Sequence, residues 1–375
     1  MTWIMQHWLA LGLLTAYTAA LLHNAYVGNQ ASLGMAGYYV GNREMSGVVV
    51  GVSFFATFAS TNTYIGHAGK AYEYGVAWFT MAILLVLFSW VSWRWIGGPL
   101  RRFALHWDAL TIPDFLGSRY IAGSSAPSRH PLLQASAIVI VFASLLYLLA
   151  IFKGAGHLFQ MFLNIPYEMG VGITLAIVVL YTSIGGFVSV VRTDVLQGAL
   201  MLIGSVVIFF FVTRAAGGVG AITELQKMAD KSFLFELNGG IPFAVLLGIS
   251  LSGSLKLLAD PRQLSRFYAL RDDTAVRQGK WIATLGLAIV LGCLFPVGIY
   301  THLILSEVAD TDLIVPTLVN DVSVFPLWAT DFLIVSILAA AMSSMDSVLL
   351  VAASTLYKNI VAPFRGPSRE LLWTR

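Results

Sequence analysis

Charged side chains are scarce in this chain. Asp, Glu, Lys and Arg make up 11% of its 375 residues, less than half of the roughly 25% that is usual for a soluble domain. Hydrophobic residues make up 58%. This composition excludes an ordinary soluble domain and predicts an all-α integral membrane protein, because helices satisfy their own backbone hydrogen bonds in a bilayer.

Cysteine is almost absent as well. Cys293 is the single cysteine, so no internal disulfide can form. The seven histidines are scattered, and neither His-x-x-x-His nor Cys-x-x-Cys spacing occurs. We therefore expect no transition-metal site and no cofactor. A nucleophile–base pair and a His-Glu-x-x-His motif are also missing, so we do not expect an enzyme.

Apolar runs of membrane-spanning length recur along the chain. A spanning helix needs about 20 residues, and we predict nine, at residues 3–22, 47–66, 76–96, 132–151, 170–184, 196–212, 241–258, 282–303 and 326–356. The first lacks the basic start and cleavage site of a signal peptide, so we expect it in the mature protein. The protein is predicted to be a multi-pass component of the cell (inner or plasma) membrane, in contact with the lipid bilayer.

The basic residues are divided unequally between the two sides of this predicted topology. Sixteen of the 22 Lys and Arg residues fall on one side and five on the other, where the loop with Glu307, Asp310, Asp312 and Asp321 has no Lys or Arg. The net charge of +3 thus follows topology and does not indicate a nucleic-acid partner. The positive-inside rule predicts that the N-terminus lies outside the cell.

Two predicted spans are interrupted by small polar residues near their middles. Ser60, Thr61, Asn62 and Thr63 interrupt the second span, and Gly253, flanked by serines, interrupts the seventh. Unwound backbone at membrane depth is tolerated only where it is buried or lines a cavity, and a pair of broken helices points to a transporter binding site. The alternative interpretation of each segment is an uninterrupted helix in which serine and glycine serve only to pack against neighbouring helices.

The last predicted span carries hydroxyls and an acid in an otherwise apolar run. Ser343, Asp346 and Ser347 stand at i, i+3 and i+4, on one helix face, and Ser344 lies beside them. Such groups are costly in lipid and mark functional sites by default. Clustered oxygens without excess charge suit a small alkali cation, whereas a hydroxyl-rich packing seam is the alternative.

Two motifs resemble those of the sodium:solute symporter family, to which sodium/glucose, sodium/proline and pantothenate transporters belong. The first runs from Gly185-Gly186 to Thr193-Asp194 and Gln197, and the second from Ala340 to Ser347. The resemblance covers about residues 37–363. It implies two inverted five-helix repeats after one extra N-terminal helix. By that scheme residues 1–24 are the extra helix, 47–213 the first repeat, 240–360 three helices of an incomplete second repeat, and 361–375 the start of a further segment, with Ser368 as a helix N-cap.

The resemblance also implies ion ligands. The sodium site would consist of the carbonyls of Ala56, Ala59 and Ala340 and the hydroxyls of Ser343 and Ser344. Some relatives hold a second ion at positions that correspond to Asp194, Ser343 and Ser347. With the acid that this chain adds, the expected second ion site is Asp194, Asp346 and Ser347. Asp346 stands where relatives have a small hydroxyl residue, and this acid either strengthens a cation site, binds a proton or pairs with a base elsewhere. Sodium is the only metal expected.

For the solute, hydroxyls on the interrupted helices are the expected ligands: Ser60, Thr63 and Ser252. No arginine lies inside a predicted span, so helix N-termini and backbone amides would neutralise a carboxylate solute. Lys256 either extends to the cytoplasmic surface, which is the favoured position, or reaches into the cavity. We expect Asp260 to be a helix N-cap before Pro261.

The sequence thus predicts sodium-coupled symport of a small organic solute by alternating access, with Na⁺ and that solute as binding partners. Two alternatives stay open. One is a membrane domain that senses a solute without moving it, and the other is a non-functional fragment, since the repeat scheme leaves two helices missing.

Overall fold

The computed structural model describes residues 7–32, 34–121, 127–238, 240–305, 308–365 and 374. Within these ranges the fold is helical and has no β-strand, only an isolated backbone bridge between Met45 and Leu270. The helices are α2 (Trp8–Ala31), α3 (Met35–Val40), α4 (Gly47–Phe58), α5 (Thr61–Tyr64), α6 (Gly66–Tyr74), α7 (Phe79–Val91), α8 (Gly98–His106), α9 (Ile112–Tyr120), α10 (Pro131–Leu163), α11 (Tyr167–Ala215), α12 (Ile222–Lys227), α13 (Phe243–Leu255), α14 (Pro261–Tyr268), α15 (Asp273–Thr301), α16 (Ile314–Asn320), α17 (Leu327–Thr355) and α18 (Ala362–Arg365).

Among the residues that the structure describes, six helical stretches are long and apolar enough to cross a membrane: Thr61–His106, Pro131–Leu163, Tyr167–Ala215, Phe243–Tyr268, Asp273–Thr301 and Leu327–Phe364. The apolar helix α4 is shorter. The all-α membrane prediction is therefore confirmed, although the count of nine spans is not reproduced. The helix α2 extends to Ala31, well beyond the end that was predicted for the first span at residue 22. The predicted helix start at Ser368 lies outside the described residues.

Two predicted spans belong to one element, α11, which Gly186 divides. Gly186 has φ 57° and ψ −151°, a backbone conformation that is essentially restricted to glycine. A Cβ atom added there would lie 2.6 Å from the ring of Tyr38. The second glycine of the Gly-Gly motif is therefore explained by backbone conformation and close packing.

The predicted interruption at Gly253 is wrong. The helix α13 continues through Gly253 to Leu255, and the short 3₁₀ turn η7 (Lys256–Leu258) follows it. The break comes later, where Asp260 accepts a hydrogen bond from the backbone N–H of Arg262 and Pro261 opens α14. Proline cannot continue the preceding helix, whereas a single glycine costs a helix only about 1 kcal/mol. The N-cap role predicted for Asp260 is confirmed.

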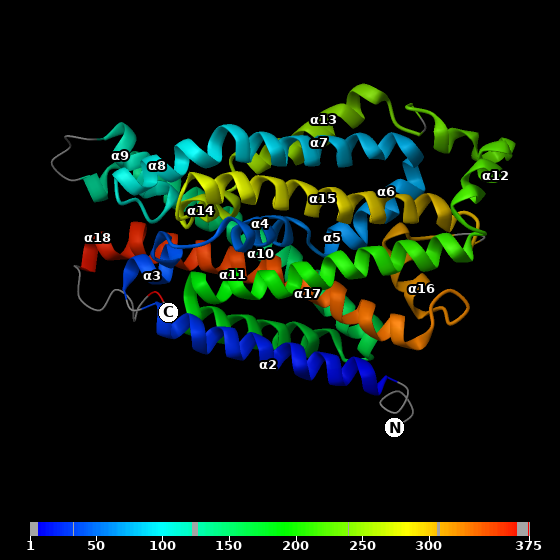
Figure 1. Ribbon diagram of the computed structural model, residues 1–375, viewed down its shortest axis with the longest axis horizontal. Coiled ribbons are helices and arrows are strands. Elements are labelled where there is room, and N and C mark those ends of the chain that lie inside the picture. The colour runs from blue at the N-terminus through cyan, green and yellow to red at the C-terminus, as the bar shows by residue number, and fades with distance from the viewer. Residues whose placement is uncertain are drawn as a thin grey trace.

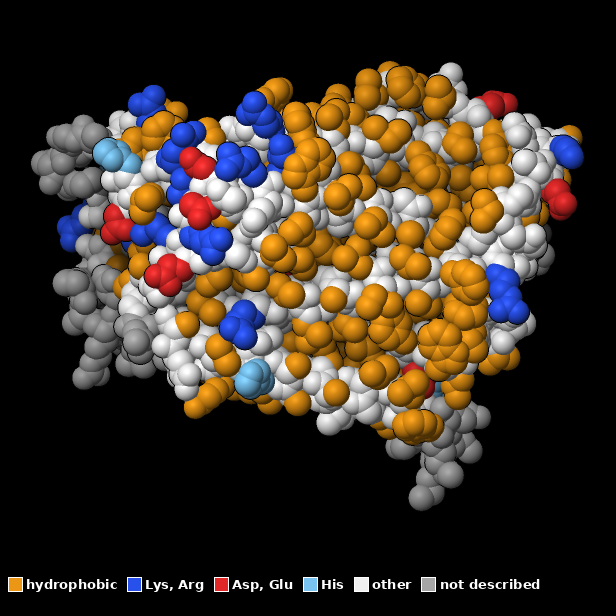
Figure 2. Space-filling view, in the orientation of Figure 1, with side chains coloured by type: hydrophobic (Ala, Val, Ile, Leu, Met, Phe, Trp, Pro, Cys, Tyr) orange, Lys and Arg blue, Asp and Glu red, His pale blue; other side chains and the backbone are white. Residues whose placement is uncertain are grey.

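The helix α17 lies at the centre of the fold and contacts α2, α4, α10 and α11. Figure 1 shows the long helices side by side, with α8, α9 and α14 at one end of the molecule and α12 and α16 at the other. Hydrophobic side chains cover the middle of the surface in Figure 2, and Lys and Arg gather at the end that carries α8 and α9. This distribution is typical of a protein whose middle faces lipid.

Candidate functional site

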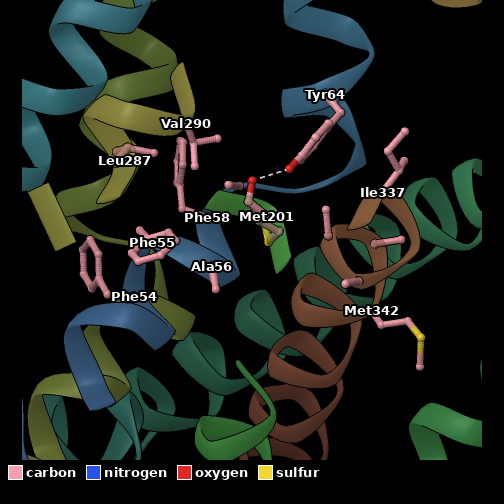
Figure 3. Close-up of a cluster of buried hydrophobic side chains, with 14 of the residues drawn as sticks. Phe54, Phe55, Ala56, Phe58, Tyr64, Met201, Leu287, Val290, Ile337 and Met342 are labelled. Carbon is pink, nitrogen blue, oxygen red and sulfur yellow. Dashed lines mark hydrogen bonds between the residues drawn. The ribbon is translucent and has the colours of Figure 1, made fainter. Parts of the chain in front are cut away.

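The backbone unwinds between α4 and α5. The helix α4 ends at Phe58, Ala59 and Ser60 adopt extended backbone angles, and α5 begins at Thr61. This confirms the break that the polar run from Ser60 to Thr63 predicted. In Figure 3 apolar side chains of α4, α15 and α17 surround the end of α4. The hydroxyl of Tyr64, beyond the break, donates a 2.6 Å hydrogen bond to the Met201 carbonyl.

The end of α4 leaves backbone carbonyls without partners in the helix, because the last carbonyls of any helix lack N–H groups above them. Two hydroxyls of α17 reach them. The Ser343 hydroxyl lies 3.0 Å from the carbonyl oxygen of Ala56, and the Ser344 hydroxyl lies 3.0 Å from that of Thr57. A helix C-terminus also carries partial negative charge. These buried oxygens thus form a cluster, joining α4 and α17, that attracts a cation.

Most of the residues predicted for sodium meet in this cluster. The Ser343 hydroxyl also lies 3.0 Å from the Ala340 carbonyl oxygen. Ala59 is fully buried at the break, but no contact links its carbonyl to Ser343 or Ser344. The Thr57 carbonyl was missed by the sequence analysis. Once the helix end at Phe58 is known, the rule that terminal carbonyls are unpaired identifies it.

An arginine lies beside this cluster, deep in the protein. Arg266 of α14 is 1% exposed and Asp194 of α11 is fully buried. The Nη2 atom of Arg266 donates to Oδ2 of Asp194 at 2.8 Å and to the Ser347 hydroxyl at 2.7 Å. It also donates to the Thr57 hydroxyl. The Nε atom donates to the Ser53 hydroxyl at 2.7 Å, and Ser53 donates to Asp194 at 2.5 Å.

This arginine corrects the expectation that no arginine enters the membrane-spanning core. Arg266 follows the apolar run that was predicted to end at residue 258, and it was one of the sixteen basic residues assigned to the cytoplasmic side. The short helix α14 instead packs against α4, α8 and α17 after the break at Asp260, and it buries Gln263 and Arg266 together with Phe267 and Tyr268. Hydropathy does not detect that such a polar half-helix is buried, because the partners of its side chains come from other helices.

Asp346 lies next to the same network. Its Oδ2 atom accepts a 2.7 Å hydrogen bond from the Tyr181 hydroxyl, and its Oδ1 atom lies 3.0 Å from the Ser347 hydroxyl. A continuous polar path therefore joins Asp194, Arg266, Ser347 and Asp346. The three residues predicted for a second ion thus lie together, but the guanidinium of Arg266 is hydrogen-bonded to two of them.

A cavity of about 820 Å³ lies beyond the break, toward the end of the molecule that carries α16. Residues of α5, α6, α7, α10 and α13 line it, together with Asp310 and Asp312. Ser60 and Thr63 belong to its lining, as predicted for solute ligands, whereas Ser252 does not and is exposed on α13. Since α13 continues as a helix through Gly253, the Ser252 side chain points away from the cavity, and we do not retain it.

The cavity contains a lysine that was expected elsewhere. Lys256 lines the cavity, and its ammonium group lies 5.0 Å from the ring centroid of Phe58 and 5.9 Å from that of Tyr147. Of the two positions considered for Lys256, the structure therefore supports the cavity and not the favoured cytoplasmic surface. The helix α13 ends at Leu255, so its C-terminus, which favours a cation, lies at the cavity.

Comparisons with known proteins agree with this architecture. Residues 38–373 match the model of the sodium:solute symporter family. The chain is 27% identical to a sodium/pantothenate symporter of Haemophilus influenzae, over 90% of this chain and 68% of that protein. It is 29% identical to an osmoregulated proline transporter of Bacillus subtilis, over 89% of this chain and 68% of that one.

A solved structure shares the fold. A Na⁺-coupled sialic acid symporter in a substrate-bound outward-open state superimposes with a TM-score of 0.78, at 20% identity, over 97% of this chain and 78% of that chain. The present chain spans about two thirds of the length of the curated relatives named above. The family match extends over about nine tenths of the chain, and it confirms the resemblance found in the two sequence motifs. This chain belongs to the sodium:solute symporter family, whose function is sodium-coupled symport.

Proposed function

We propose that this protein imports a small organic monocarboxylate together with Na⁺, by alternating access to the cavity between α5, α6, α10 and α13. The observation that carries the proposal is the position of the cation-attracting oxygen cluster at the end of α4, directly beside a cavity lined by Lys256. Phe58, the last residue of α4, lines that cavity and lies beneath the Lys256 ammonium group. An ion and a solute bound at these places would be neighbours.

The proposed sodium ligands are the carbonyls of Ala56 and Ala340 and the hydroxyls of Ser343 and Ser344, with Ala59 completing the set and Thr57 as a further carbonyl. All of these residues are fully buried. At present the two hydroxyls donate to carbonyls across the helix interface. Na⁺ would replace these hydrogen bonds and hold α17 against the end of α4. The ion therefore stabilises the same contact that shapes one wall of the cavity.

The class of solute follows from the charges in the cavity. Two lysines and two acids line it, Lys153 and Lys256 with Asp310 and Asp312. Within the described part of the chain neither lysine forms an ion pair with Asp or Glu, and it is Lys256 that lies beside Phe58 at the break. Thr61 adds a hydroxyl that is buried without a hydrogen-bond partner among the described residues. An unpaired ammonium and free hydroxyls suit a carboxylate with further polar groups. Ser60 and Thr63 are the proposed hydroxyl ligands.

The two-repeat organisation is also a proposal. It is supported by breaks in corresponding places, because the first helix of each predicted repeat is followed by a short second piece: α4 by α5, and α13 by α14. We propose further that the end with α8 and α9 faces the cytoplasm and that the N-terminus lies outside. The concentration of Lys and Arg at that end supports this orientation.

Uptake into proteoliposomes tests the proposal. Purified protein is reconstituted, and a Na⁺ gradient is compared with an equal K⁺ gradient for pantothenate, proline, sialic acid and simple monocarboxylates. We expect Na⁺-dependent accumulation of a monocarboxylate and none with K⁺. Accumulation that is equal in Na⁺ and K⁺ would contradict coupling to sodium, and uptake restricted to neutral or cationic solutes would contradict the solute class.

A further inference from the structure

We propose that Arg266 is a built-in cation that fills the second ion site, so that this protein binds one Na⁺, and that removal of its charge admits a second. The inference rests on the proposed function, because it concerns the number of ions in the transport cycle. Its basis is the set of contacts that the guanidinium makes.

Among the described residues, all hydrogen-bond acceptors of the Arg266 guanidinium are oxygen atoms. It donates to the carboxylate of Asp194, the hydroxyls of Ser53, Thr57 and Ser347, and the carbonyl of Arg262. One carboxylate with several neutral oxygens is the environment that a hard monovalent cation takes in a protein. The five donors of an arginine satisfy the same oxygens through hydrogen bonds.

The guanidinium and a second Na⁺ would compete for the same atoms. Asp194 and Ser347, which the family resemblance assigned to a second ion, both accept hydrogen bonds from Nη2 of Arg266, at 2.8 and 2.7 Å. Two like charges held at one carboxylate in a dry interior repel each other strongly. Arg266 therefore excludes Na⁺ from this position for as long as its guanidinium stays there.

Unpartnered oxygens beside the arginine are an independent observation. Oδ1 of Asp194 and Oε1 of Gln197 are buried and have no hydrogen-bond partner among the described residues. These residues stand at i and i+3 on α11, so their side chains share one helix face. If the guanidinium were removed, the Asp194 carboxylate would lose its charged partner, and a buried unpaired charge is strongly unfavourable. A small cation with access to these oxygens would then bind.

A tethered cation differs from Na⁺ in one functional respect. Arg266 belongs to α14 and cannot leave the protein, so it neutralises Asp194 throughout the cycle without consuming the sodium gradient. The number of ions moved per solute is thereby set by one side chain.

The test compares Na⁺ binding by the unmutated protein with binding by Arg266→Gln. Equilibrium binding of ²²Na⁺ to purified protein gives the number of sites, and the Na⁺ dependence of uptake in proteoliposomes gives the Hill coefficient. We expect about one bound Na⁺ and a Hill coefficient near 1 for the unmutated protein, and about two and a value approaching 2 for Arg266→Gln.

Two control variants separate charge from general disturbance of α14. Arg266→Lys keeps the positive charge and should keep one site. Arg262→Gln removes a buried arginine from the same helix, but that side chain pairs with Asp260 at 2.5 Å and not with Asp194, so we expect one site again. In Arg266→Gln combined with Asp194→Asn, the carboxylate is also absent, and the second site should disappear.

Two results would overturn the inference: two Na⁺ bound by the unmutated protein, or one Na⁺ bound by a folded Arg266→Gln protein. The first needs no variant and therefore stands even if Arg266→Gln cannot be purified. Absence of any Na⁺ binding or Na⁺-dependent uptake by the unmutated protein is a different result, which contradicts the proposed function itself.

Discussion

The hydroxyl of Ser343 lies 3.0 Å from the carbonyl oxygen of Ala56, although 287 positions separate these residues in the chain. One belongs to the central helix α17 and the other to the last turn of α4, just before the backbone unwinds. Any ion that binds between them therefore fixes the position of one helix relative to the other. This is the physical link between ion binding and the shape of the cavity.

Removing both hydroxyls should abolish sodium dependence. We predict that Ser343→Ala with Ser344→Ala eliminates Na⁺-stimulated uptake but leaves membrane insertion intact, because alanine is a good helix former. Uptake with and without Na⁺, normalised to the amount of protein in the membrane, measures this. Ser136→Ala provides a control, because that hydroxyl donates to the Leu133 carbonyl within α10. Na⁺ stimulation at the unmutated level in the double variant would contradict the site.

Lys256 should determine affinity for the solute. We predict that Lys256→Gln raises the KM for a monocarboxylate by roughly tenfold to a hundredfold, because a hydrogen bond to a charged group is worth about 1.5–3 kcal/mol. The uncharged amide of the same solute should lose little affinity. Lys70→Gln is a matched control, since Lys70 pairs with Glu73 in a half-exposed ion pair outside the cavity. Equal KM values for Lys256→Gln and the control would exclude a role in carboxylate binding.

Transport should be electrically silent if both proposals hold. One Na⁺ moved with one monocarboxylate transfers no net charge, so a membrane potential does no work on the cycle. We predict that a K⁺ diffusion potential of either sign, set with valinomycin, changes the initial uptake rate very little. The Na⁺ concentration gradient then provides the drive, about 1.4 kcal/mol for each tenfold ratio. A rate that rises steeply when the interior is made negative would mean that more than one Na⁺ enters per anion.

The two buried acids should respond differently to neutralisation. Asp194→Asn leaves Arg266 buried without its carboxylate, and breaking such a pair typically costs about 3–5 kcal/mol. We therefore expect large losses of folded protein and of Na⁺-dependent uptake. Asp346→Asn keeps an acceptor for the Tyr181 hydroxyl, so we expect retained uptake with an altered pH profile or Na⁺ dependence. Unchanged transport kinetics in Asp346→Asn would assign that acid a purely structural role.

The topology can be tested with single cysteines in a Cys293→Ala background. Tyr120 is 67% exposed at the α9 end, and Val322 is 83% exposed at the α16 end. We predict that a membrane-impermeant thiol reagent applied to intact cells labels Val322→Cys and not Tyr120→Cys. Labelling after cell lysis provides the control for reactivity. The reverse pattern would place the N-terminus in the cytoplasm.

The sequence by itself determined that the protein lies in a lipid bilayer and to which family it belongs. Scarce charge and repeated apolar runs require a bilayer, because only helices satisfy the backbone there. The motifs around Asp194 and Ser343 were sufficient to identify the family. The polar run from Ser60 to Thr63 predicted a real break. Four consecutive small polar residues within an apolar span interrupt the helix at their own position, so the break can be read from the local sequence.

Tertiary structure alone decided where the second break lies and what fills the core. Gly253 is tolerated within α13, whereas the helix is interrupted at Asp260. The packing of α14 beyond this break brings Arg266 to Asp194, 72 positions away, and Lys256, before the break, lies at the cavity. A charged residue next to an apolar run is the same in the sequence whether it reaches water or a buried carboxylate. Only the packing of α14 against α4 and α17 distinguishes the two, because burial of a charge depends on partners that come from distant parts of the chain.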